Sequence, residues 1–110
     1  MAKTFLLEVV SPESIVWSGQ AEMLITRTTE GEIGVLADHE PTMAALATGS
    51  TVITAEGGEK TTLAIHGGFM QILDNEVTLL TDRAEIVEGD REQAAELAQS
   101  LAGAEEADEE

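Results

Sequence analysis

The sequence has no cysteine and no apolar run of membrane-spanning length. Without cysteine, neither a disulfide framework nor a thiolate ligand or nucleophile is available. No stretch approaches the roughly 20 apolar residues that a membrane-spanning helix needs. The apolar run after Lys3 is broken at Glu8, which makes it too short for the core of a signal peptide. We therefore expect a soluble chain that reaches a membrane only through a partner.

Positive charge is also scarce. The chain has 5 Lys and Arg against 22 Asp and Glu, which gives a formal net charge of −17. Nucleic acid is excluded as a partner because its phosphates require a basic face, and adsorption to anionic lipid is disfavoured for the same reason. Half of the acids, 11 of 22, fall in residues 82–110. The simplest interpretation is a solubilising acidic tail on a moderately acidic domain.

What the sequence does contain is a long series of short segments with period-two alternation. From Thr4 to about Thr81, segments of four to eight residues follow this pattern, and Phe5, Leu7 and Val9 share one face of the first. Residues 56–59 and 74–75 lie between such segments and supply the residue types that tight hairpins need. Many short strands with frequent turns predict an antiparallel β-sandwich or barrel with a Leu, Ile, Val and Met core.

The period changes after Gly89. Asp90 is a good N-cap, and one apolar stripe with helical spacing follows, made of Ala94, Leu97, Ala98 and Leu101. We therefore divide the chain into a β-sandwich domain over residues 1–88 and a region over residues 89–110. The second region is expected to hold one short helix at about 91–102 and a disordered acidic tail.

No pattern of catalytic, cofactor-binding or metal-ligating residues was found. The two histidines, His39 and His66, belong to neither a His-Glu-x-x-His nor a His-x-His cluster, so no metal is expected. Glycine-rich nucleotide-binding loops and the Gly-x-Ser-x-Gly nucleophile motif are absent from the sequence. We therefore expect no cofactor and no enzymatic activity.

The segment over residues 31–36, Gly-Glu-Ile-Gly-Val-Leu, is followed by His39 and Pro41. It resembles the epsilon subunit of rotary F-type ATP synthases, which carries a Gly-Glu-Ile/Leu-Gly-Ile/Val strand and a Gly-His-Ala-Pro loop at this distance from its start. Further matches occur in the same order, at residues 9–13, 18–19, 49, 67–69 and 77–80. The resemblance covers roughly residues 4–88. It implies a sandwich of about ten short strands in two sheets.

The resemblance also implies a function and its contact residues. It indicates a non-catalytic rotor subunit of the central stalk that joins the gamma subunit to the membrane c-ring. Such a subunit is assembled with alpha, beta and delta subunits at the cytoplasmic face of the bacterial cell membrane. Ser11 and His39 fall at positions on the gamma-facing side, and Glu30, Gly31 and Glu32 match the turn that faces the c-ring. A structural interpretation of His39 stays open, in which its imidazole bonds nearby carbonyls before Pro41.

The chain departs from the family after the sandwich. Longer epsilon subunits carry a two-helix hairpin there, which in some members inhibits ATP hydrolysis. Here 21 residues follow Gly89, enough for one helix of about 18 Å, so deletion of residues 90–110 is expected to change ATP hydrolysis little. The alternative to a synthase subunit is a stand-alone ligand-binding or cupin-like β-sandwich, which the missing His-x-His pattern disfavours.

Overall fold

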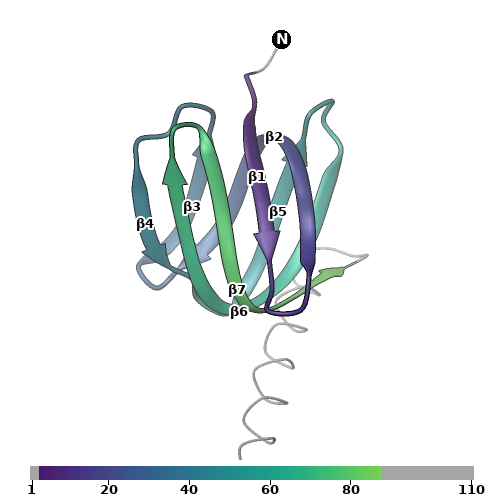
Figure 1. Ribbon diagram of the computed structural model, residues 1–110, viewed down its shortest axis with the longest axis vertical. Helices are drawn as coiled ribbons and strands as arrows, with labels where there is room; N and C mark the ends of the chain where they lie inside the picture. The colour runs from purple at the N-terminus through teal and green to yellow at the C-terminus, as the bar shows by residue number, and fades with distance from the viewer. Residues whose placement is uncertain (1–2, 88–110) are drawn as a thin grey trace, which may run out of the picture.

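The computed structural model describes residues 3–87, and β-strands make up most of this region (Figure 1). There are seven: β1 Phe5–Val10, β2 Ile15–Thr28, β3 Gly31–Leu36, β4 Thr42–Ala45, β5 Gly49–Ala55, β6 Lys60–Leu73 and β7 Glu76–Val87. This confirms the prediction that the fold is mainly β. None of the described residues forms a helix long and apolar enough to cross a membrane. The helix and acidic tail predicted within residues 89–110 lie outside the described residues.

The strand pairings form a closed circuit. β1 pairs with β2 and β7, β7 pairs with β6, β6 with β5, and β5 with β2. β3 adds to β2 and β4 adds to β6, outside the circuit. Every pair is antiparallel except β1 with β7, which is parallel.

The circuit is flattened into two layers, because β2, β6 and β7 are long enough to bend from one layer into the other (Figure 1). We call the layer that contains β1 the front layer and the one that contains β5 the back layer. The front layer consists of β4, residues 68–73 of β6, residues 76–81 of β7, β1, and residues 15–21 of β2. The back layer consists of residues 83–87 of β7, residues 60–66 of β6, β5, residues 21–28 of β2, and β3.

One detail of the predicted sandwich, the number of strands, was wrong. About ten short strands were expected, whereas seven are present, because three continuous strands each supply one segment to both layers. The predicted antiparallel arrangement holds for every pair except that of β1 with β7. β1 lies between β2 and β7, and the chain from β1 to β7 runs through the whole domain, so no short hairpin dictates that pair's direction.

Gly67 and Gly68 allow β6 to bend between layers without ending. Their φ angles are 69° and 120°, a region that L side chains rarely adopt. A Cβ at Gly68 would overlap the carbonyl oxygen of Leu80 and lie 2.7 Å from the Cα of Thr81. A Cβ at Gly67 would lie 2.7 Å from Oδ2 of Asp82. The adjacent bend of β7 therefore fills the space that any side chain at Gly68 would need.

Alternate side chains from both layers meet in the core. Phe5, Leu7 and Val9 are buried, as predicted for one face of the first strand. The other buried core residues are Ala21, Leu24, Val35, Leu46, Ile53, Leu63, Ile65, Met70, Ile72, Val77 and Leu79. Burying each large apolar side chain contributes about 1.5–3 kcal/mol. The buried hydroxyl groups of Thr26 and Thr51 satisfy each other through a hydrogen bond of 2.7 Å.

Both predicted hairpin turns are present. In the 56–59 turn, Gly57 and Gly58 have φ angles of 96° and 94°. In the turn between β6 and β7, Asp74 and Asn75 have φ angles of 51° and 62°, which is the left-handed conformation that two-residue hairpin turns favour. These turns fix the antiparallel register on either side of each of them.

Candidate functional site

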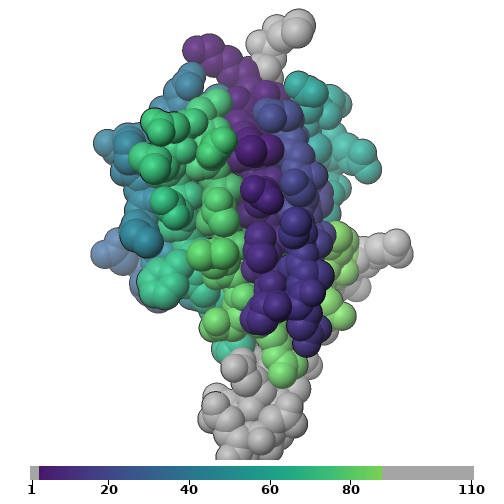
Figure 2. All heavy atoms as spheres, viewed as in Figure 1, coloured from purple at the N-terminus to yellow at the C-terminus, as the bar shows by residue number. Residues whose placement is uncertain are grey.

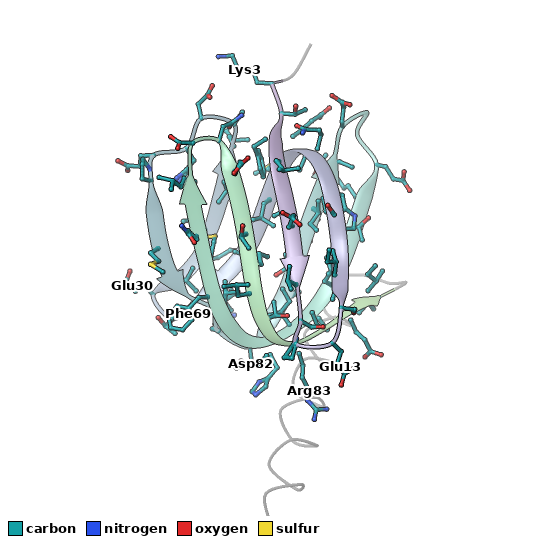
Figure 3. All side chains as sticks on the ribbon, viewed as in Figure 1. Lys3, Glu13, Glu30, Phe69, Asp82 and Arg83 are labelled. Carbon is teal, nitrogen blue, oxygen red and sulfur yellow. The ribbon has the colours of Figure 1, made fainter. Side chains whose placement is uncertain are left out.

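The loops of the domain gather at its two ends, at the top and bottom of Figure 1. We call the lower one the Gly68 end; it contains residues 11–14, 29–30, 46–48, 66–68 and 81–83. We call the upper one the Asn75 end; it contains Lys3 and residues 37–41, 56–59 and 74–75. In Figure 3, Lys3 marks the Asn75 end, whereas Glu13, Asp82 and Arg83 mark the Gly68 end.

Ser11 lies at the Gly68 end, where β1 turns into β2. Its backbone N–H donates to the carbonyl oxygen of Ser14 at 2.9 Å, and its hydroxyl donates to the same oxygen at 3.2 Å. The Ser11 hydroxyl therefore helps to stabilise the loop over residues 11–14, a structural role that the sequence did not indicate.

Glu30 and Gly31 lie at the Gly68 end too, at the turn between β2 and β3. The Thr28 hydroxyl accepts from the Glu30 N–H at 3.1 Å and donates to the Gly31 carbonyl at 2.8 Å. Glu32 was predicted to belong to the turn, but it is already within β3, and its Cα pairs with that of Arg27 across the ladder. The pairing follows from the tightness of the turn, which ends at Gly31. Glu30 is thus the acidic residue that the turn itself presents (Figure 3).

His39 lies in the loop over residues 37–41 at the Asn75 end. Its Nδ1 atom is 2.9 Å from the carbonyl oxygen of Glu40. This contact agrees with the structural interpretation of a loop imidazole that bonds a nearby carbonyl before Pro41. The side chain is half-buried, so part of the ring is accessible.

The structure therefore places Ser11 and the Glu30 turn at the same end of the sandwich and His39 at the other. Ser11 follows β1 and His39 precedes β4, and both of these strands belong to the front layer with β7 and β6 between them. Three strand spacings amount to about 14 Å. A single partner can contact both Ser11 and His39 only if it covers the outer face of the front layer diagonally.

That outer face carries an apolar feature that was not singled out from the sequence. Phe69 is 56% exposed, Leu80 is 52% exposed and Ile15 is 60% exposed. These three belong to one register row that crosses the front layer, hereafter the apolar row: Ala45, Phe69, Leu80, Val10 and Ile15. Figure 2 shows this face toward the viewer. Large exposed apolar side chains that adjoin one another are typical of protein-binding surfaces.

A sequence signal for the apolar row exists. Adjacent apolar pairs such as Val9-Val10 and Leu79-Leu80 put one side chain on each face of a strand, because successive side chains alternate. In each pair the first residue is buried, and the second contributes to the apolar row. These pairs indicate that the front layer is apolar on both of its faces where β1 and β7 lie side by side.

The described residues hold no cluster suited to metal binding. Among residues 3–87 there is no group of three or more His, Asp or Glu that could bind a metal ion. His66 directs its Nδ1 to the hydroxyl of Thr48 at 2.8 Å. Lys3 and Asp38 form an exposed ion pair of 3.3 Å at the Asn75 end.

Comparisons with known proteins point to one family. The family described as "ATP synthase, Delta/Epsilon chain, beta-sandwich domain" matches residues 4–87. An ATP synthase epsilon chain of Streptomyces avermitilis is 38% identical over 96 residues, covering 87% of this chain and 77% of that protein. One of Brevibacillus brevis is 44% identical over 80 residues, covering 73% of this chain and 61% of that protein.

A solved structure agrees with these matches. A chain in the Euglena gracilis mitochondrial ATP synthase, described as OSCP/F1/c-ring, superimposes with a TM-score of 0.73 at 33% identity. The similarity covers 93% of this chain and 64% of that chain. The two chains therefore share a fold over most of this chain. The chain belongs to the family of ATP synthase delta/epsilon chains.

Proposed function

We propose that this chain is the non-catalytic epsilon subunit of an F-type ATP synthase, and that its sandwich joins the gamma subunit to the c-ring in the central stalk. Rotation driven by ion flow would then reach the catalytic sector of alpha and beta subunits without slippage. The observation that carries the proposal is the family match over residues 4–87, which spans the entire described sandwich. Its bacterial relatives support a peripheral association with a membrane through the assembled complex, which includes alpha, beta and delta subunits. The proposed position is the cytoplasmic face of the bacterial cell membrane.

The outer face of the front layer is the best candidate for the gamma contact. The apolar row lies between the two residues proposed to face gamma, with Ser11 beside its Val10–Ile15 pair and His39 at the opposite corner. Burial of Phe69, Leu80 and Ile15 against a partner removes large apolar surfaces from water, each worth about 1.5–3 kcal/mol when burial is complete. Interface energy concentrates in such central apolar side chains.

The turn that contains Glu30 is the best candidate for the c-ring contact. It lies at the Gly68 end, carries a negative charge and is exposed. Each exposed ion pair that it forms with polar loops of the ring contributes about 0–1 kcal/mol. Such pairs fix the orientation of the subunit more than they increase its affinity. Glu32 follows this turn within β3, opposite Arg27 in the ladder.

Purification from membranes tests the proposal. The full-length chain with an affinity tag should bring down gamma together with alpha and beta, identified by mass spectrometry. A variant in the apolar row gives a comparison with the wild-type chain. At equal expression, the chain with Leu80→Ser should recover less gamma than wild type. Recovery of the wild-type chain alone, with turnover of a small molecule, would instead favour the ligand-binding sandwich.

A further inference from the structure

At the Asn75 end, one side chain joins three separate parts of the fold. The Oδ1 atom of Asn75 accepts from the backbone N–H of Asp38 at 2.7 Å, and its Nδ2 donates to the carbonyl oxygen of Thr4 at 3.0 Å. Its own carbonyl oxygen accepts from the N–H of Leu6 at 3.2 Å. Asn75 therefore ties the β6–β7 turn both to the start of β1 and to the loop over residues 37–41.

An amide is the side chain of this size that fits this arrangement. The Asp38 group is a donor and the Thr4 group is an acceptor, so the side chain between them must accept on one side and donate on the other. This pattern also fixes which amide atom faces which neighbour. A carboxylate would lose the bond to Thr4 and add negative charge beside Asp38. Glycine would keep the positive φ of Asn75 and lose both side-chain bonds.

The 37–41 loop depends on this tether. Asp38 has a φ of 63°, a left-handed conformation that is uncommon outside glycine and persists when surrounding contacts support it. The ion pair between Asp38 and Lys3 is exposed, with 62% and 79% of the respective side-chain surfaces accessible, and contributes little. The bonds that His39 and Thr42 make to the Glu40 carbonyl are local and do not join the loop to another part of the fold. Besides the packing of Ala37 against the core, the bond to the Asn75 amide is therefore the contact that holds this loop against the sandwich.

The loop geometry determines what His39 offers to a partner. A carbonyl oxygen only accepts, so Nδ1 of His39 carries the hydrogen that bonds Glu40. In the neutral ring, Nε2 then carries a lone pair and acts as an acceptor. We propose that Asn75 is a positioning residue that holds the 37–41 loop so that His39 presents Nε2 to a hydrogen-bond donor on gamma. This inference rests on the proposed function for the partner's identity.

Hydrogen exchange on the full chain tests the tether without any partner. Asn75→Gly should speed exchange of the Asp38 amide by about fivefold, the equivalent of one lost hydrogen bond. Asn75→Asp should speed it less, since an acceptor for that amide remains. Asp74→Gly is the matched control, because it makes the same backbone change one residue earlier in the turn and should leave the Asp38 amide unchanged. Equal exchange in wild type and Asn75→Gly would overturn the tether.

Binding to purified gamma tests whether the tether acts through His39. His39→Ala and Asn75→Gly should each weaken binding by roughly fivefold, and the double variant should bind no more weakly than His39→Ala alone. Independent effects that multiply in the double variant would overturn the link between the two residues. Faster Asp38 exchange with unchanged gamma binding in every variant would overturn the proposed contact of His39 while the tether itself stands. The two experiments therefore separate a failure of the tether from a failure of the proposed function.

Discussion

The chain reverses its direction at both the Gly68 end and the Asn75 end of the sandwich, but different features of the sequence make the two reversals possible. At the Gly68 end, β6 and β7 bend side by side between layers, and backbone atoms of Leu80 and Thr81 occupy the space over Gly68. At the Asn75 end, the β6–β7 turn is open to solvent, and side-chain hydrogen bonds of Asn75 hold its neighbours. One end depends on the absence of a side chain and the other on the presence of one.

The difference predicts how each end responds to substitution. A change at the Gly68 bend disturbs the backbone of two strands that belong to both layers, so it affects folding. A change at the Asn75 end alters the position of one loop and leaves the core in place. Substitutions at the Asn75 end should therefore weaken partner binding without a large loss of stability. Substitutions at the Gly68 bend should reduce stability and partner binding together.

The largest expected effect is that of Gly68→Ala. The added Cβ would overlap the Leu80 carbonyl at a φ of 120°, so the free energy of unfolding should fall by about 3–5 kcal/mol. Gly57→Ala is the control, because its φ is 96° but nothing lies within 4 Å of the added Cβ; it should cost about 1–2 kcal/mol. Urea denaturation measures both. Equal losses would mean that backbone angle alone, and not the crossing of β6 and β7, makes glycine necessary.

The next effect concerns gamma binding at the apolar row. Leu80→Ser should weaken binding to gamma at least tenfold, or about 1.4 kcal/mol, because it removes an apolar contact from the centre of the proposed interface. Ile86→Ser is its match, since both side chains are 52% exposed on β7 but Ile86 belongs to the back layer. Calorimetric titration of gamma with each variant gives the comparison. Similar weakening by both would place the gamma contact elsewhere.

A smaller effect is expected at the turn that we propose as the c-ring contact. Glu30→Lys should reduce ion pumping relative to ATP hydrolysis in membranes, because it reverses the charge at the turn while leaving the core intact. Glu32→Lys should act in the same direction, with an added cost of about 0.2–1 kcal/mol in the chain, because it places two cations opposite each other at Arg27. Unchanged coupling in Glu30→Lys, with normal recovery of the subunit, would show that this turn is not a contact.

The smallest change in the chain's own stability is expected for four residues in loops. A bulky or charged replacement at Ser11 or His39 should reduce binding to gamma, whereas charge reversal at Glu56 or Glu59 should not. All four lie in loops, so each should shift stability by only about 0.5 kcal/mol. A pull-down with matched amounts of folded chain measures the contrast. Equal loss of gamma in both groups would point to a general folding defect.

Much of the fold could be predicted from the sequence because the relevant signals are local. Alternation placed Phe5, Leu7 and Val9 in the core, and the residue types at 56–59 and 74–75 located two turns. Strand number could not be predicted in the same way. The pair Gly67-Gly68 interrupts alternation as a turn would, yet the ladder between β6 and β7 resumes on its other side. Whether a glycine ends a strand or bends it depends on what packs above it, which is a tertiary property.

The local setting of individual site residues could be predicted from the sequence, but their arrangement in space could not. Glu30 and His39 were each correctly placed in a turn or loop, yet the distribution of Ser11, Glu30 and His39 over the two ends depends on which strands pair and in which direction. Asn75 was recognised only for its backbone conformation in the turn. Its side-chain role links it to Thr4 and Asp38, far away in the sequence. No local pattern reports contacts over that separation.

The bent strands have a mechanical consequence. In a sandwich whose layers share only side-chain contacts, a shearing load slides one layer over the other against weak, non-directional forces. Here β2, β6 and β7 each run through both layers, and pairing of β1 with β2 and β7 closes the circuit. Displacing the layers would require stretching covalent backbone and breaking ladder hydrogen bonds together. A chain built this way resists deformation as one stiff block, which is the property that the proposed role of joining gamma to the c-ring would require.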